Sequence, residues 1–239
     1  LRKIHSQDPT VSIKFSKELR QQILSCQGEL HLATIDWVLQ KVYGIKTSFE
    51  QPRITYRETI QRSATTSYKH KKQSGGSGQF GVVKIIFEPV NPNEHDFLFE
   101  EQIHGGSVPR GYFPAVEKGL SDIFQKGTLA GFPVIGIKAT LIDGAYHAVD
   151  SNEISFKLAA RLCFKNALEQ ASPTLLEPIM RLSIVVNDDY VGDIMGDITK
   201  RRGQVSGMDP LSGGKQRIIA EAPESEIISY TLDLQAMTQ

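Results

Sequence analysis

Apolar residues recur at the three- and four-residue spacing of an amphipathic helix in several separate stretches of the chain. One predicted helix follows Gly28 and ends at Gly44, a residue suited to the left-handed turn after a helix. A second begins at Pro114, which is favoured in a first turn, and ends at Gly127. The apolar faces of the two helices are Leu32, Ile35, Val38, Leu39 and Val42 in the first, and Val116, Leu120, Ile123 and Phe124 in the second.

Three further helices are predicted in the second half of the chain. A long helix follows Asp150, the predicted N-cap, and ends before Pro173. Another runs from Tyr190 to Arg202, with basic residues in its last turn that suit the helix dipole. Gly203 is predicted to take the left-handed position beyond that helix. The last helix starts near Pro223.

Apolar and polar residues alternate between these helices, which is typical of strands with one buried face. The predicted strands are 11–15, 22–25, 45–49, one ending at Thr66, 82–87, 97–103, 134–141, 180–186, 204–208 and 216–222. The last two pair as a hairpin around residues 210–214, which include Gly213 and Gly214.

The order of elements divides the chain into three segments and predicts an α+β fold. Residues 1–54 contain strand, strand, helix and strand, which is most of a ferredoxin-like α/β sandwich without its first strand. Residues 55–177 form the middle segment. Residues 178–239 repeat β-α-β-β-α, a ferredoxin-like unit without its last strand. The missing strands, together with the lack of an initiator Met, predict that the chain is a fragment.

Composition excludes some classes of protein. Lys+Arg and Asp+Glu are both 27, and this neutral balance argues against a bulk electrostatic binder such as a histone-like protein. Cys26 and Cys163 do not make a disulfide framework, so reduced thiols in a cytoplasmic protein are expected. No apolar run has the length of a membrane span, so no membrane partner is expected. The six histidines lie at no metal-ligand spacing, so no metal site is predicted, and no catalytic constellation emerges.

The stretch from Lys69 to Gly81, KHKKQSGGSGQFG, concentrates positive charge and glycine, and no Asp or Glu occurs between Glu58 and Glu88. It predicts a cationic mobile loop that suits a polyanion. A nucleotide-binding loop is a weaker interpretation, because Gly-Lys-Ser/Thr spacing is missing and a strand follows rather than a helix. A hairpin tip with solvated lysines is the other alternative.

Two more stretches carry candidate contacts. The loop from Gly144 to Ser151 contains His147 beside Tyr146, a pattern that suits stacking on or hydrogen bonding to bases, although a histidine taken alone is more often an ordinary exposed one. Lys200, Arg201 and Arg202 are either a helix end matched to its dipole or an RNA contact. The run from Leu211 to Gln216 is similar to the signature of transporter ATPases, but a strand follows it and no phosphate loop accompanies it, so a turn is predicted.

Eight blocks in register resemble bacterial translation elongation factor G over essentially the whole chain. They are Gly28-Glu29-Leu30-His31-Leu32, Tyr56-Arg57-Glu58-Thr59-Ile60, Lys69 to Gly81, Pro114-Ala115-Val116-Glu117-Lys118-Gly119, Leu129-Ala130-Gly131-Phe132-Pro133-Val134, Tyr146-His147-Ala148-Val149-Asp150-Ser151, Leu176-Glu177-Pro178-Ile179-Met180 and Gly192-Asp193-Ile194-Met195-Gly196-Asp197.

The resemblance implies three domains of that family. Residues 1–54 are a truncated ferredoxin-like domain III, and residues 178–239 a truncated ferredoxin-like domain V. Residues 55–177 are domain IV, with the fold of the second domain of ribosomal protein S5 and a left-handed βαβ crossover. The GTP-binding domain lies upstream in the family, so no enzymatic turnover and no cofactor are expected of this chain. GTP and Mg²⁺ belong to that missing domain of a translational GTPase.

The resemblance also implies partners for a monomeric, cytoplasmic factor: the ribosome, tRNA and mRNA. In the family, two loops at the domain IV tip enter the small-subunit decoding region during GTP-dependent translocation. The residues matched to this tip are Lys71, Lys72, Gln73, Ser74, Gly75, Gly76, Ser77, Gly78, Gln79, Tyr146, His147 and Asp150. Lys200, Arg201 and Arg202 of domain V are matched to rRNA near the large-subunit GTPase-associated centre.

Some residues depart from the family pattern. Ser77 stands where many members have Arg, Gln27 where Met is usual, and Ala33 where Asp is usual. These departures leave open a diverged paralogue used in ribosome recycling or stress. A tetracycline-protection-type ribosomal GTPase, which shares the architecture, is a second alternative, and the intact His147 loop argues against it.

Overall fold

Residues 2–73 and 78–238 are described by the structure, which is a computed structural model. The chain forms two compact units: Leu1–Thr55 together with Glu177–Gln239, and Tyr56–Leu176. Both units combine helices with mainly antiparallel sheets, so the predicted α+β class is confirmed. Among the described residues, no helix is both long enough and apolar enough to span a bilayer.

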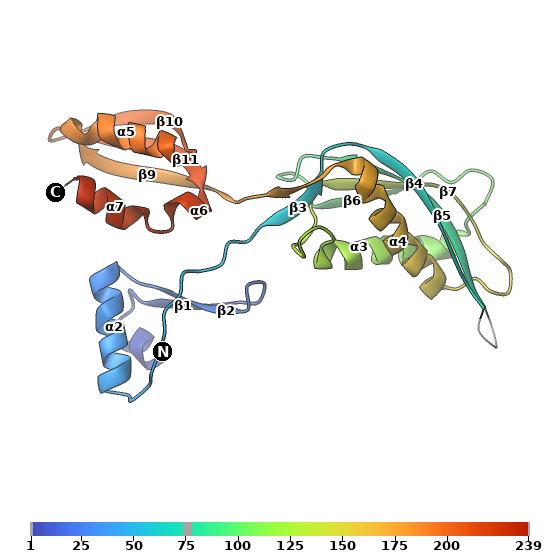
Figure 1. The fold of residues 1–239 in the computed structure, drawn as a ribbon, viewed down its shortest axis with the longest axis horizontal. Helices are drawn as coiled ribbons and strands as arrows, with labels where there is room; N and C mark the ends of the chain where they lie inside the picture. The colour runs from blue at the N-terminus through green and yellow to red at the C-terminus, as the bar shows by residue number, and fades with distance from the viewer. Residues whose placement is uncertain (1, 74–77, 239) are drawn as a thin grey trace. The chain divides into compact units, whose positions relative to one another are not determined.

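The unit Tyr56–Leu176 is built on a four-stranded sheet with strand order β4-β5-β7-β6. β5 pairs antiparallel with both β4 and β7, and β6 lies parallel to β7. The two long helices, α3 and α4, cover one face of this sheet (Figure 1). Element bounds are β4 Ala64–Lys72, β5 Gln79–Pro89, β6 Phe97–Glu101, β7 Ile137–Ala145, α3 Phe113–Lys126 and α4 Glu153–Ala171.

Alternation along the strands puts their apolar residues against the helices. Val83, Ile85 and Phe87 of β5 are fully buried, and Phe164 of α4 packs on Phe87 with ring centroids 5.2 Å apart. Each such side chain contributes about 1.5–3 kcal/mol on burial. α3 ends as predicted, because Gly127 takes a φ of 71° at its C-cap. The core therefore holds the sheet rigid beneath any contact made at its end.

The buried carboxylate of Glu58 fixes the loop of residues 128–132 in this unit. Glu58 lies in β3 (Arg57–Ile60), which pairs with β8 (Pro173–Leu176), and its residue is only 2% exposed. Its two oxygens accept five consecutive backbone N–H groups, those of residues 128–132, at 2.6 to 3.0 Å. Burial raises the pKa of Glu58, but the N–H donors outweigh it and leave the pKa below the ordinary 4.5. The carboxylate therefore stays charged and fixes the loop before β7.

The N-terminal part of the other unit, Leu1–Thr55, has a small core of its own. Two antiparallel strands and α2 pack around Val11, Ile35 and Leu39. Gly44 has the predicted left-handed conformation after α2, with φ 66°. Element bounds here are α1 Arg2–Gln7, β1 Ser12–Ser16, β2 Gln21–Ser25 and α2 Glu29–Lys41.

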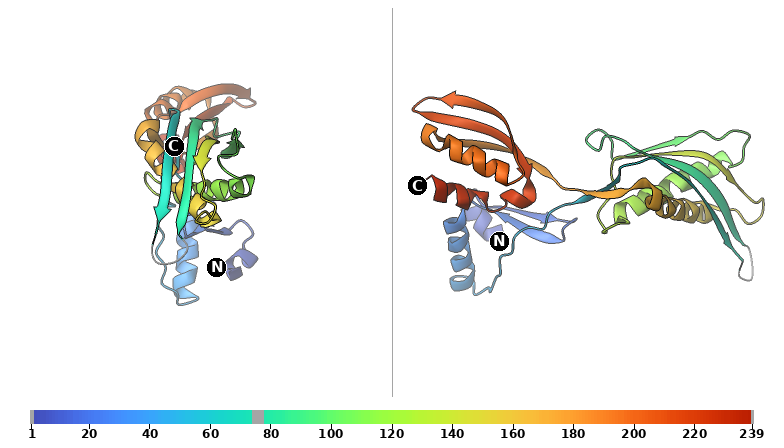
Figure 2. Two further views of the ribbon diagram at one scale, coloured as in Figure 1. Left: turned by 90° about the vertical axis from the view of Figure 1, so that its right-hand side faces the viewer. Right: turned by 45° about the horizontal axis from the view of Figure 1, so that its top comes forward.

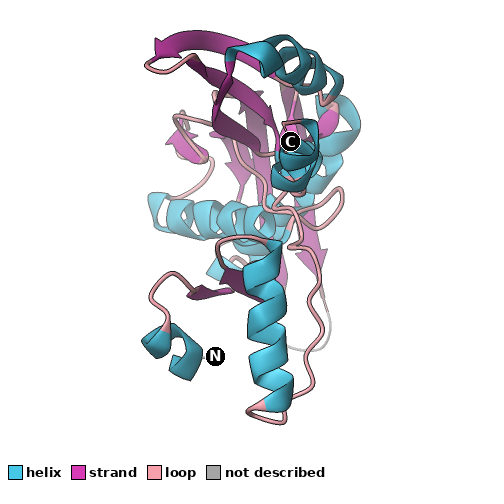
Figure 3. Cartoon of the chain, turned by 90° about the vertical axis from the view of Figure 1, so that its left-hand side faces the viewer, coloured by secondary structure: helices cyan, strands magenta, loops and turns pink. Residues whose placement is uncertain are grey.

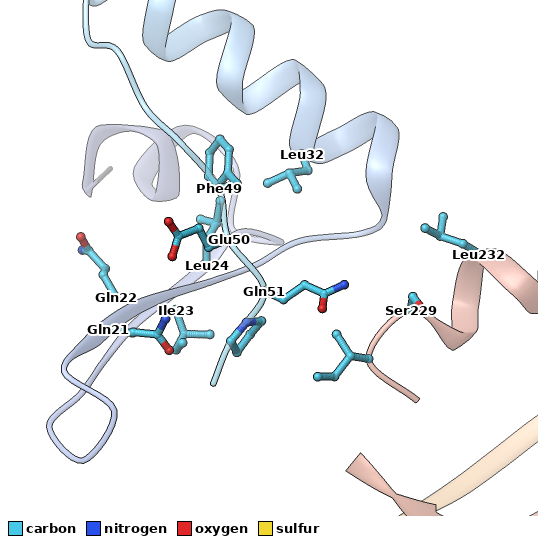
Figure 4. Close-up of a pocket in the computed structure, with 12 residues that line it drawn as sticks. Gln21, Gln22, Ile23, Leu24, Leu32, Phe49, Glu50, Gln51, Ser229 and Leu232 are labelled. Carbon is cyan, nitrogen blue, oxygen red and sulfur yellow. The ribbon is translucent and has the colours of Figure 1, made fainter. Parts of the chain in front are cut away.

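The strand predicted at 45–49 is wrong. Residues 44–56 form no helix or strand, and Figure 3 draws a long loop after α2. In the part of the chain that the structure describes, β2 pairs only with β1. Its free side borders a cavity of about 370 Å³ (Figure 4). A strand needs a partner for its backbone groups, and the apolar alternation of 45–49 has none. The cavity is lined by Gln21, Gln22, Ile23, Leu24, Leu32, Phe49, Glu50, Gln51, Pro52, Ile228, Ser229 and Leu232.

The C-terminal part has a three-stranded antiparallel sheet in the order β10-β11-β9. Ile184, Ile194, Ile198 and Ile218 form its core with Tyr230. The glycine turn predicted between the last two strands is confirmed at Ser212–Gly214. Element bounds are β9 Ile179–Asn187, α5 Val191–Lys200, β10 Gln204–Leu211, β11 Lys215–Pro223, α6 Glu224–Ile227 and α7 Tyr230–Met237.

The prediction that Gly203 takes the left-handed position after α5 is wrong. Arg202 does so instead, with φ 59°. Gly203 follows it and donates its N–H to Ile198 O at 2.9 Å. A Cβ on Gly203 would lie 2.7 Å from Ile198 Cγ2 and 3.0 Å from Glu221 O. The glycine is thus required by close packing rather than by its own φ.

Replacing Glu58 with Gln is expected to lower the free energy of unfolding of this unit by about 3 kcal/mol, because a neutral amide leaves several buried N–H groups without a strong acceptor. The pKa of Glu58 is lowered in the folded state, so its contribution is complete above pH 4.5 and is lost as the pH falls through the folded pKa. Urea unfolding should therefore show a gap between wild type and E58Q that is widest near neutral pH. The exposed Glu117→Gln is the control, and a gap of constant size across this pH range would contradict the assignment.

Candidate nucleic-acid interface

The basic residues predicted to form a mobile loop are mostly in strands. Residues 69–72 complete β4, and residues 79–81 begin β5, so that part of the prediction is wrong. β4 and β5 pair without a register shift from Ala64↔Phe87 to Lys72↔Gln79. Figure 2 shows the two strands side by side. The lysines are therefore held by a hydrogen-bonded hairpin. Ser74, Gly75, Gly76 and Ser77 of the predicted tip lie outside the described residues.

Asp150 joins the hairpin to the second loop. Its Oδ1 accepts the N–H of Gly78 at 3.1 Å, and its backbone O accepts the N–H of Phe80 at 2.9 Å. A Cβ on Gly78 would lie 2.9 Å from Asp150 Cγ, so glycine lets the carboxylate approach. Ser151 adds a third link, because its Oγ donates to Phe80 O at 2.8 Å. The structure thus brings together two loops that are about 70 residues apart in sequence.

Asp150 was predicted to cap the long helix, and this prediction is wrong. The N-cap of α4 is Asn152, whose Oδ1 accepts the N–H of Ser155 at 2.9 Å. Asp150 lies two residues before that position, and its carboxylate is instead occupied by Gly78. Asn152 was not considered from the sequence, although its side chain suits an N-cap as well as that of Asp150.

The ring of His147 is oriented by its own loop. Its Nδ1 accepts the N–H groups of Val149 and Asp150 at 3.3 and 3.2 Å. The Asp150 carboxylate lies farther away, at 3.5 Å from Nδ1. These two donors place the ring proton of neutral His147 on Nε2, so Nε2–H is the ring's remaining hydrogen-bond donor. The side chain is 54% exposed, so a partner can reach it.

The remaining predicted tip residues that the structure describes are exposed, except Gln79, which contacts a histidine side chain. Lys71, Lys72 and Gln73 are exposed, and Tyr146 is 49% exposed. Gln79 Oε1 lies 2.9 Å from His70 Nε2 across the hairpin.

Sequence reasoning missed Phe80 as part of the site. Its ring lies 6.2 Å from that of His147, and Lys69 Nζ lies 5.6 Å from the ring centroid. An aromatic residue directly after a glycine-rich basic run is the signal that points to it. Phe80 thereby connects the strand lysines with the histidine loop.

The basic residues at the end of α5 have different environments. Arg201 is held by Asp197 at 2.7 Å and by Asp233 at 2.8 Å, and its guanidinium lies 4.9 Å from the ring centroid of Tyr230. Arg202 pairs with Glu177 and Glu226. Both arginines are thus paired with carboxylates of their own compact unit, whereas Lys200 is exposed. Hydrogen bonds to Asp197 and Asp233 raise the pKa of Arg201. Its role as an RNA contact stays a prediction.

Metal-ligating and nucleophilic side chains are not grouped at this site. Among the described residues, no group of three His, Cys, Asp or Glu side chains could hold a metal ion. Cys163 is buried beside Thr66, and burial raises the pKa of its thiol to about 11. A thiol in that state is a poor nucleophile near neutral pH.

Three consecutive parts of the chain match models of one protein family. The family models for elongation factor G match as domain III at residues 1–51, domain IV at 52–172 and the C-terminus at 174–239. A protein from Thermus thermophilus, known from a crystal structure, is 40% identical with a TM-score of 0.86. The similar region covers 99% of this chain and 35% of that chain, so this chain spans about a third of that relative's length.

Replacing Asp150 with Ala is expected to free the Gly78 amide and loosen the connection between the two loops. Loss of one part-buried hydrogen bond of about 1 kcal/mol predicts roughly fivefold faster hydrogen exchange at Gly78. Asp150→Asn, which keeps the Oδ1 acceptor, is the matched control. Unchanged exchange in D150A would show that the carboxylate does not hold the hairpin.

Lys200→Gln and Arg201→Gln are expected to differ in their effects. R201Q should lower the unfolding free energy by about 2 kcal/mol, because it leaves Asp197 and Asp233 without their shared cation. K200Q should leave stability unchanged within about 0.5 kcal/mol, because the side chain is exposed. Thermal unfolding of both variants measures this, and equal stability losses would contradict the assignment.

Proposed function

Because the chain belongs to the elongation factor G family, we propose that it is the ribosome-contacting C-terminal part of a translocase that moves tRNA and mRNA through the ribosome. The observation that carries this proposal is the joined tip, in which Asp150 holds the basic hairpin against the loop of His147. Two joined loops with a hydrogen-bond donor on an exposed histidine and with exposed lysines suit an RNA target.

The proposed partners are those that the resemblance to elongation factor G implies for each domain. Nε2–H of His147 and the lysines of the β4–β5 hairpin would contact the tRNA–mRNA duplex and rRNA in the small-subunit decoding region. Lys200 would contact large-subunit rRNA near the GTPase-associated centre. The factor would act as a monomer in the cytoplasm.

The tip would block backward movement of the tRNA and mRNA by steric contact and hydrogen bonding. Its hairpin is braced by the sheet and by the Asp150 contacts, so it would keep its shape against a moving tRNA. Occupying the space behind the tRNA would prevent the tRNA and mRNA from slipping back. No chemical step is required of the tip residues themselves.

The energy source would lie outside this chain. The three matched domains account for 1–51, 52–172 and 174–239, which leaves no stretch of these residues for a GTP-binding domain. We propose that the complete protein is a translational GTPase whose GTP and Mg²⁺ bind in that other domain. The chain itself would have no turnover.

The test replaces His147 with Ala in a full-length factor that carries this chain. Translocation is expected to slow about tenfold, because one donor at the tip is lost, while ribosome-stimulated GTP hydrolysis stays within about twofold. Fast single-turnover kinetics measure both rates. His95→Ala, an exposed histidine in the loop after β5, is the matched control. Equal loss of both activities in H147A would contradict the tip-contact mechanism.

A further inference from the structure

The chain passes between domain IV and the other unit twice, and the two connections differ in length. The crossings follow Thr55 and Leu176. On the entry side, residues 44–56 form no helix or strand. On the return side, only Glu177 and Pro178 lie between β8 and β9. Two residues span at most about 7 Å, so the return connection can absorb little displacement.

The return connection is held at its C-terminal end. Arg202 donates from Nη1 to Glu177 Oε1 at 2.6 Å and from Nη2 to Oε2 at 3.1 Å. Such a bidentate pair restricts the orientation of the carboxylate as well as its position. Pro178 O accepts the N–H of Glu224 at 3.0 Å, and proline fixes the φ of that residue. The two connecting residues are therefore tied to the C-terminal part.

β8, where the connection begins, is held by β3. The two strands pair over four residues, and Glu58 lies opposite Leu175. The Glu58 N–H donates to Pro133 O, and Glu58 O accepts the N–H of Ile135, both at 2.9 Å. Its carboxylate accepts the five N–H groups of residues 128–132. We call these backbone and carboxylate contacts of Glu58 the Glu58 clamp.

The loop that the Glu58 clamp holds is attached to the rest of domain IV. The N–H of Val134 donates to Phe124 O of α3 at 2.7 Å. The ring of Phe132 lies 5.4 Å from that of Tyr56, which is the first residue of this unit. The same loop therefore contacts the strand that enters the unit and the helix that packs beneath its sheet.

We infer that Glu58 and Arg202 are positioning residues for translocation, because they hold the two ends of one connection and make domain IV move with the C-terminal part. The inference rests on the proposed function, since the connection matters only for a tip that has to be moved. The contacts lie in series, from the loop at 128–132 through β3 and β8 to Glu177. Release of either end would let β8 turn without carrying the tip along.

The first test is a double-mutant cycle in a full-length factor that carries this chain, read by single-turnover translocation. E58Q is expected to slow translocation about fivefold and R202Q about threefold, because a poorly directed tip reaches its position less often. If both residues act in one series, E58Q/R202Q is slowed about fivefold, rather than the roughly fifteenfold of independent effects. Ribosome-stimulated GTP hydrolysis should stay within about twofold in all three. E117Q and R217Q, at exposed positions, are the matched controls.

A second measurement separates coupling from loss of folding, since E58Q also lowers stability. In a Cys26→Ser background, spin labels at Lys118→Cys of α3 and Lys215→Cys of β11 report the distance between the two units. The distribution of this distance should widen in both single variants. Labels at Lys118→Cys and Lys84→Cys, both within domain IV, should give one distribution throughout. Circular dichroism checks that each variant is folded at the temperature of the assay.

The outcomes separate this inference from the proposed function. In a factor that translocates, multiplied slowing in E58Q/R202Q overturns the coupling alone, because Arg202 would then act separately from the Glu58 clamp. Unchanged distances between the units in both single variants also overturn it, as does a widened distribution within domain IV. A wild-type factor that hydrolyses GTP without translocation overturns the proposed function and the coupling with it. Non-multiplied slowing together with widening only between the units supports the coupling.

Discussion

The two ladders of backbone hydrogen bonds that β5 forms with β4 and β7 hold the candidate interface in place. One ladder carries the basic residues to the end of the hairpin, and the other fixes the strand that leads into the His147 loop. Because the inward side chains of β5 are fully buried, a slip of one residue would expose the core. Register is thus enforced by packing as far as the last described pair of the hairpin, Lys72↔Gln79.

Charge is organised differently in the two units, although the chain as a whole is neutral. In the C-terminal part, Arg201 and Arg202 form ion pairs with acidic side chains of the same compact unit. In domain IV the strand lysines near the tip lack such partners among the described residues. A net charge of zero therefore conceals a local cationic surface. Binding by such a surface is expected to be salt-dependent.

Two carboxylates of domain IV, Glu58 and Asp150, accept backbone N–H groups but have different roles. Glu58 is enclosed and satisfied by five N–H groups, so its charge is internal and serves structure. Asp150 is partly exposed and accepts the Gly78 N–H across two loops, so its charge organises a surface. Both carboxylates accept backbone donors that a loop would otherwise leave unpaired. The same interaction thus stabilises the scaffold in one place and shapes the contact in another.

The sequence by itself determined the α+β class, most helices and strands, the helix end at Gly127 and the order of motifs that identifies the family, because these depend on local periodicity, turn residues and composition. Only the tertiary structure decided four other features. Residues 45–49 lack a pairing partner, Asn152 rather than Asp150 caps α4, and the basic run joins a strand. After α5, Arg202 rather than Gly203 takes the left-handed conformation, and Gly203 is closely packed against Ile198 and Glu221. Each depends on atoms that are distant in sequence, and a local pattern carries no information about such neighbours.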